Sequence, residues 1–198
     1  MKRNLILCAG MLFAHLSLFA QPANCWNDPR MNADNRLDNV SAYFAYESEA
    51  LASQGKMSAS SRYLSIEGNW TFNWVKNADE RPDGFFALNY DDKGWGTMPV
   101  PGIWELNGYG DPIYVNNQYA WRNDWRTNPP YVQDLENHVG SYRRWFDIPA
   151  AWKGQKIYIH IGSATSNLFM YVNGKYVGYS EDSKVAAEFD ITPYVKPE

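Results

Sequence analysis

Residues 170–178 read Met-Tyr-Val-Asn-Gly-Lys-Tyr-Val-Gly, and this stretch decides the fold. Asn173 and Gly174 stand between two runs that are typical of strands. A type I′ turn needs positive φ at both of its central residues, and Asn followed by Gly meets that need at little steric cost. The stretch therefore predicts a β-hairpin with a two-residue turn.

Short runs of the same kind occupy most of the chain beyond Arg62, separated by Gly, Pro, Asn and Asp. In residues 68–74, Trp70, Phe72 and Trp74 are expected on one face, because side chains alternate along a strand. The other predicted strands are 63–66, 98–101, 140–146, 156–161 and 167–172. Repeated short strands with little helix predict an all-β fold, a jelly-roll-like antiparallel β-sandwich.

The chain divides into three segments. Residues 1–20 are predicted to be a signal peptide, and residues 21–61 an extended N-terminal arm with a short amphipathic helix within 38–54. The arm is too aromatic for a solvated tether, so we expect it to lie on the folded body. Residues 62–198 are expected to form one sandwich domain, truncated at its C-terminal end because a further strand would be expected there.

Residues 1–20 combine a basic start, an apolar stretch and a small last residue, Ala20, which is the pattern of a secretory signal. A membrane-spanning helix is the alternative, but the stretch is short and contains His15 and Ser17. We therefore expect an exported protein, periplasmic or secreted, without a membrane segment after cleavage. Cys25 is then the only cysteine of the mature chain, so no disulfide can form within it.

Composition excludes one class of partner and favours another. The net charge is −4 and the 18 basic residues are scattered, so the chain offers no positive stripe for nucleic acid. Aromatic residues make up 16% of the chain, with 9 Trp and 14 Tyr. Aromatic rings can stack against the C–H face of a sugar, although most of them could equally fill the core. The composition favours a carbohydrate binder.

Motifs for other chemistries do not occur in the sequence. The three histidines are isolated, and neither a phosphate-binding loop nor a Gly-x-Ser-x-Gly motif is present. A glycosidase needs two carboxylates that flank the scissile bond. The acids in loop-like contexts are Glu105, Glu136, Glu181 and Asp182. None of them stands out from a solvated loop acid, so we assign no catalytic residue and no metal ligand.

Residues 98–125 form the most informative stretch, MPVPGIWELNGYGDPIYVNNQYAWRNDW. It is long, irregular and rich in Trp, Tyr, Asn and Gly, and a loop of such length within a compact domain is usually functional. Its amides could bind sugar hydroxyls while its rings stack. The alternative is a structural loop whose side chains cap their own backbone.

The order of these motifs along the chain is informative. In sequence they occupy residues 26–29, 35–36, 68–72, 99–101, 108–109, 112–116, 128–130, 140–144, 169–179 and 183–190. The series resembles the sugar-binding domain that opens large bacterial β-galactosidases of glycoside hydrolase family 2, and it covers nearly all of the mature chain. The resemblance implies a galactose-binding-domain-like sandwich within an enzyme that hydrolyses terminal non-reducing β-D-galactose residues in β-galactosides.

The resemblance also implies a role for one residue. In the family, the Asn of an Ile-Tyr-x-Asn stretch reaches into the active site of a neighbouring catalytic barrel and helps to hold the galactosyl hydroxyls. The matching residue here is Asn116. The two catalytic glutamates lie far downstream on that barrel, so this chain alone is expected to be inactive. The implied partners are a β-galactoside and the downstream barrel, and a homo-oligomer is compatible with the resemblance.

The resemblance alone implies two bound ions. An Asp that binds sugar and sodium lies, in the family, beyond the position of Glu198. Relatives can also hold magnesium between the arm and the sandwich, but here Cys25 stands where some have Asp, and Glu181 where a Gln is found. No cofactor is therefore assigned in this chain, and magnesium and sodium are expected only of the full-length enzyme.

Other functions are compatible with the same fold. Family 2 also contains β-glucuronidases and β-mannosidases, although residues 113–116 and 128–130 favour a galactosidase. An independent carbohydrate-binding module would need the same aromatic surface without a catalytic neighbour. A purely structural domain would use its aromatic residues as core. A reading frame that continues into an α/β-barrel would favour the enzyme over the last two.

The signal pattern generates the first testable prediction. Cleavage after Ala20 should leave Gln21 at the mature N-terminus, because the small residue follows the apolar stretch directly. Mass spectrometry of the exported protein measures this. A soluble cytoplasmic product that retains Met1 would contradict the prediction.

Overall fold

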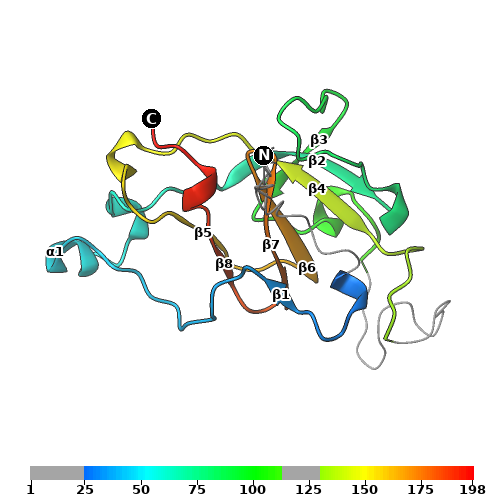
Figure 1. Ribbon diagram of the computed structural model, residues 1–198, viewed down its shortest axis with the longest axis horizontal. Coiled ribbons are helices and arrows are strands. Elements are labelled where there is room, and N and C mark those ends of the chain that lie inside the picture. Colours follow the sequence, from blue (N-terminus) through cyan, green and yellow to red (C-terminus); the bar gives the residue numbers. More distant parts are fainter. Residues whose placement is uncertain (1–24, 113–129) are drawn as a thin grey trace, which may run out of the picture.

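The computed structural model describes residues 25–112 and 130–198, and most of the regular structure within these ranges is antiparallel β-strand (Figure 1). The strands are β1 Ala33–Asp34, β2 Gly68–Val75, β3 Gly96–Val100, β4 Val139–Arg143, β5 Tyr158–Ile161, β6 Asn167–Val172, β7 Lys175–Glu181 and β8 Ala187–Asp190. They form sheets of order β1-β7-β6, β3-β2-β4 and β5-β8. The prediction of an all-β, antiparallel fold is confirmed.

Helical structure is limited to short pieces. One α-helix is described, α1 Glu49–Ala52. The 3₁₀ turns are Cys25–Asn27, Met57–Ala59, Ala78–Glu80, Glu105–Asn107, Ala150–Trp152 and Thr192–Tyr194. Within the two described ranges, no helix combines the length and the apolar character that crossing a bilayer requires.

The predicted hairpin is present as β6 and β7. Asn173 and Gly174 have φ values of 50° and 78°, so both central residues of the turn adopt the positive φ of a type I′ turn. Val172 pairs with Lys175 across the turn. Further along, the register shifts by one residue, because Tyr171 pairs with Tyr176 whereas Met170 pairs with Gly178. This bulge turns the two faces of β7 toward different parts of the core.

Most of the other predicted strands are also observed, but with different lengths. Segments 68–74, 98–101, 140–146 and 156–161 overlap β2, β3, β4 and β5, the last two of which are shorter than predicted. The prediction of a strand at 63–66 is wrong, because this backbone joins no ladder. Its Ile66 carbonyl instead accepts a hydrogen bond from Trp70 Nε1 at 2.9 Å. Strand propensity without a partner strand does not make a sheet.

Residues 33–37 of the predicted arm contact the folded body. β1 pairs with β7, and the guanidinium of Arg36 donates to Ser180 Oγ at 2.9 Å. The backbone N–H of Leu37 donates to the Glu188 carbonyl, also at 2.9 Å. The helix predicted within 38–54 is confined to the four residues of α1, which Ser48 caps by accepting from the Leu51 N–H.

Two hydrophobic clusters meet at β7. In the view of Figure 1, β7 lies between the β5-β8 sheet on one side and the β3-β2-β4 sheet on the other. The larger cluster contains Ile148, Ile157, Ile159, Val177, Ala187, Phe189 and Ile191. The smaller contains Cys25, Tyr176 and Tyr179. Gly178 lies between them, so close to its neighbours that an added Cβ would be 2.6 Å from both the Asp34 carbonyl oxygen and the Phe189 ring.

Gly178→Ala is expected to destabilise the fold. A methyl group at this position overpacks two rigid neighbours, so the free energy of unfolding should fall by about 1–3 kcal/mol. The control is Gly94→Ala, where an added Cβ meets no atom within 4 Å and a change within about 0.5 kcal/mol is expected. Urea unfolding of both variants measures the difference. Equal unfolding midpoints would contradict this account of β7.

Candidate functional site

An aromatic cluster covers the inner face of the β3-β2-β4 sheet. Phe72 on β2 is 1% exposed and is paired across the ladder with Tyr142 on β4, with ring centroids 4.6 Å apart. Tyr109 packs edge-on against Phe72 at 4.8 Å, and Trp104 lies at 6.1 Å. Trp70 and Trp74 contact Tyr142 and Tyr109 respectively. The predicted alternation of 68–74 is therefore confirmed.

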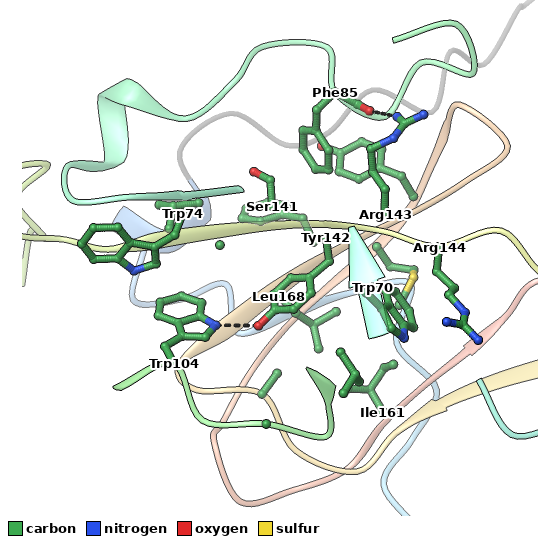
Figure 2. A pocket seen from close by; sticks show the side chains of 18 of the residues that line it. Trp70, Trp74, Phe85, Trp104, Ser141, Tyr142, Arg143, Arg144, Ile161 and Leu168 are labelled. Atoms are coloured by element: carbon green, nitrogen blue, oxygen red, sulfur yellow. Dashed lines mark hydrogen bonds between the residues drawn. The ribbon is translucent and has the colours of Figure 1, made fainter. Parts of the chain in front are cut away.

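One hydrogen bond fixes the polar ends of two of these rings. The indole N–H of Trp104 donates to the Tyr142 hydroxyl at 2.5 Å, as Figure 2 shows. Burial raises the pKa of Tyr142 above its ordinary value, although the hydrogen bond from Trp104 acts in the opposite direction. The phenol is therefore neutral at physiological pH and serves as a fixed polar group on an otherwise apolar wall.

His138 flanks this wall beside Trp74. The rings of Trp74 and His138 lie 4.9 Å apart, and Gly110, at φ 73°, turns against both. The indole N–H of Trp74 is buried and has no hydrogen-bond partner among the described residues. In the sequence, His138 stands apart from other candidate residues. Only the pairing of β2 with β4 brings it beside Trp74.

The described residues on either side of segment 113–129 have defined contacts. Before it, Tyr109 packs against Phe72 and Gly110 lies against His138. After its end, the Val132 N–H donates to Asn27 Oδ1 at 2.6 Å, and the Asp134 carbonyl accepts from the Ala78 N–H at 2.8 Å. Asn116, the predicted sugar ligand, lies outside the described residues.

A large groove, shown from close by in Figure 2, extends along the aromatic wall. Its volume is about 2600 Å³, and it is lined by Trp70, Trp74, Trp104 and Tyr142 on one side and by residues of β5 and β6 on the other. Pockets that enclose a small ligand usually measure about 300–1000 Å³. The groove offers aromatic faces but is too large to enclose a single sugar ring.

Arg143, on the same strand as Tyr142, has a structural partner set. Its guanidinium donates to Asp92 at 2.8 Å and to the carbonyls of Ala87, at 3.0 Å, and Phe85. The side chain is 10% exposed. Arg143 therefore fixes the chain between β2 and β3 onto the sheet and is not available to a ligand.

The acids weighed as catalytic candidates have no partner that suggests a catalytic role. Glu136 forms an ion pair with Lys76 at 2.8 Å. Glu181, expected in a loop, is instead the last residue of β7 and accepts from the Tyr179 hydroxyl at 2.5 Å. Glu105 begins a 3₁₀ turn. These positions give no indication of a catalytic pair among the described residues.

The partly buried acids Asp34 and Glu181 lie near the buried Cys25. The hydroxyl of the buried Tyr176 donates a hydrogen bond to the Asp34 carboxylate at 2.9 Å. The Tyr179 hydroxyl donates to the Glu181 carboxylate in the same way. Burial, followed by the charges of Glu181 and Asp34, raises the pKa of the Cys25 thiol. In the part of the chain that the structure describes, no three His, Cys, Asp or Glu side chains come together to hold a metal ion.

The chain was compared with known proteins. Residues 63–197 match the family described as glycosyl hydrolases family 2, sugar binding domain. The chain is 35% identical over 182 residues to a β-galactosidase of Priestia megaterium and 38% identical over 167 residues to one of Halalkalibacterium halodurans. These alignments cover 90% and 84% of this chain but only 18% and 16% of the relatives.

A solved β-glucuronidase from an uncultured Clostridium species matches 68% of this chain and 20% of its own, with 24% identity and a TM-score of 0.46. That similarity is too low to bear on the choice of sugar. The family match is independent of it and spans β2 to β8, including the aromatic wall and the groove. The chain therefore belongs to glycosyl hydrolase family 2, as a sugar binding domain of that family.

Proposed function

We propose that this chain is the sugar-binding portion of an exported β-galactosidase, in which it completes the substrate pocket while another part of the protein performs the hydrolysis. The observation that carries the proposal is the similarity to two β-galactosidases along most of the chain. Because the chain spans less than a fifth of their length, the catalytic carboxylates are assigned to the remainder of the protein. Export is inferred from residues 1–20.

The geometry supports a contributing role over an independent one. A sugar-binding pocket combines apolar faces with several convergent polar groups. The described residues supply the rings of Trp74, Trp104 and Tyr142, but Trp104 and Tyr142 bond to each other, and the groove is far larger than one sugar. The domain therefore needs a neighbouring surface to form a tight pocket.

Asn116 is the residue that we propose to bind the galactosyl unit. An amide can donate to one hydroxyl and accept from another, which suits a sugar ring whose neighbouring hydroxyls can each donate and accept. Among the described residues on either side of segment 113–129, Gly110 lies beside His138 and the Asp134 carbonyl accepts from the Ala78 N–H.

Asn116→Ala in the full-length enzyme is expected to lower kcat/KM for a chromogenic β-galactoside by roughly ten- to a hundredfold. Loss of one hydrogen bond that strengthens in the oxocarbenium-like transition state corresponds to about 1.5–3 kcal/mol. The melting temperature should change little. The matched control is Asn117→Ala, which should hydrolyse the substrate at nearly the wild-type rate. Two variants as active as wild type would show that Asn116 does not bind the sugar.

The isolated 198-residue chain is expected to hydrolyse no chromogenic β-galactoside above background, because hydrolysis needs two positioned carboxylates that we assign elsewhere. Its affinity for galactose should be too weak to detect by calorimetry, since one domain keeps only part of the convergent polar groups. Measurement uses chain purified from a host that lacks β-galactosidase. Turnover by this preparation would contradict the assignment of catalysis to the rest of the protein.

A further inference from the structure

The β5-β8 sheet (Figure 1) turns one face to the core and the other to solvent. On the inner face, Ile159 and Phe189 pair across the ladder and are 7% and 0% exposed. Because side chains alternate along a strand, the pairs on either side of this one project from the opposite, outer face. These pairs are Tyr158 with Asp190 and His160 with Glu188. Ile159 lines the groove, whereas none of the four outer residues does.

Tyr158 is an aromatic residue that the fold leaves in solvent. It is 51% exposed, whereas Ile157 and Ile159, its neighbours along the chain, are 4% and 7% exposed and supply the contacts to the core. An exposed ring keeps apolar surface in water at a cost in free energy. The same ring surface can stack against the C–H face of a sugar. Tyr158 therefore contributes an aromatic surface to the outer face of this sheet.

Two ion pairs flank Tyr158 on this face. Lys156 Nζ lies 3.0 Å from Asp190 Oδ2, and His160 Nδ1 lies 2.8 Å from Glu188 Oε1. The side chains of Lys156 and His160 are 68% and 55% exposed, so both remain accessible to a ligand. Each carboxylate has a basic partner, which leaves little net charge to attract an ion. Hydrogen-bond donors and acceptors stand side by side, a combination that suits a neutral ligand rich in hydroxyl groups.

A small hollow of about 220 Å³ continues from one end of this row. It is lined by Gly154, Gln155, Lys156, Ile157, Thr192 and Pro197. Lys156 borders the hollow and also bonds to Asp190, the residue paired with Tyr158. Pockets for drug-sized ligands measure about 300–1000 Å³, so this hollow suits one small unit of a larger ligand. The amide of Gln155 can donate to a hydroxyl and accept from another.

We propose that the outer face of the β5-β8 sheet, together with this hollow, binds a neutral oligosaccharide. One sugar unit stacks on Tyr158, the flanking ion pairs bond to its hydroxyls, and the adjacent unit enters the hollow beside Lys156. A single galactose covers only the ring or only the hollow, so measurable binding requires a longer saccharide. The choice of a β-linked galactan as the ligand rests on the proposed function.

Affinity gel electrophoresis of the full-length enzyme, in gels with and without neutral β-linked galactan, tests the proposal. Galactan should retard the wild-type enzyme. Tyr158→Ala removes the stacking surface and should raise the dissociation constant for galactan by at least about tenfold. Tyr158→Phe keeps the ring and should bind galactan nearly as well as wild type. Melting temperatures show whether each variant is folded.

The matched control is Tyr43→Ala, which removes a tyrosine that is 79% exposed and lies in the arm, and which should leave the retardation unchanged. A wild-type enzyme that galactan does not retard, or equal retardation of wild type and Tyr158→Ala, would overturn the proposal. Hydrolysis of a chromogenic β-galactoside by the wild-type enzyme tests the proposed function separately. An active enzyme without retardation contradicts only the binding face, whereas a retarded but inactive enzyme contradicts only the proposed function.

Discussion

The close approach of β7 to its neighbours is the constraint on which the rest of the structure depends. Gly178 leaves no room for a side chain between the Asp34 carbonyl and the Phe189 ring, so the arm, β7 and β8 meet at backbone distance. The bulge beside it turns Val177 toward one hydrophobic cluster and Tyr179 toward the other. One strand thereby joins the N-terminal arm to both parts of the core.

The aromatic wall depends on this core only indirectly. The proposed sugar-binding function depends more directly on the wall than on the core. Phe72 and Tyr142 face each other across the β2-β4 ladder, and the rings around them fix Tyr109 and Gly110 at the start of segment 113–129. Arg143, which follows Tyr142 on β4, holds the chain between β2 and β3 in place.

Features determined by a few neighbouring residues could be predicted from the sequence. The turn at Asn173 and Gly174 is an example, since its φ requirement is local. The strand predicted at 63–66 failed because pairing depends on distant segments. The contact of Trp74 with His138 was missed for the same reason, as it exists only once β2 and β4 pair. The sugar-binding role proposed for Asn116 rests on the family resemblance, because no local pattern distinguishes this residue from Asn117.

The central claim is that this domain contributes a contact to the galactosyl unit in a larger enzyme. A crystal structure of the full-length protein with bound galactose tests it most directly. The account predicts a side-chain amide atom of Asn116 at roughly 2.7–3.2 Å from a galactosyl hydroxyl. A galactose bound without any atom of residues 25–198 within hydrogen-bond distance would contradict the claim.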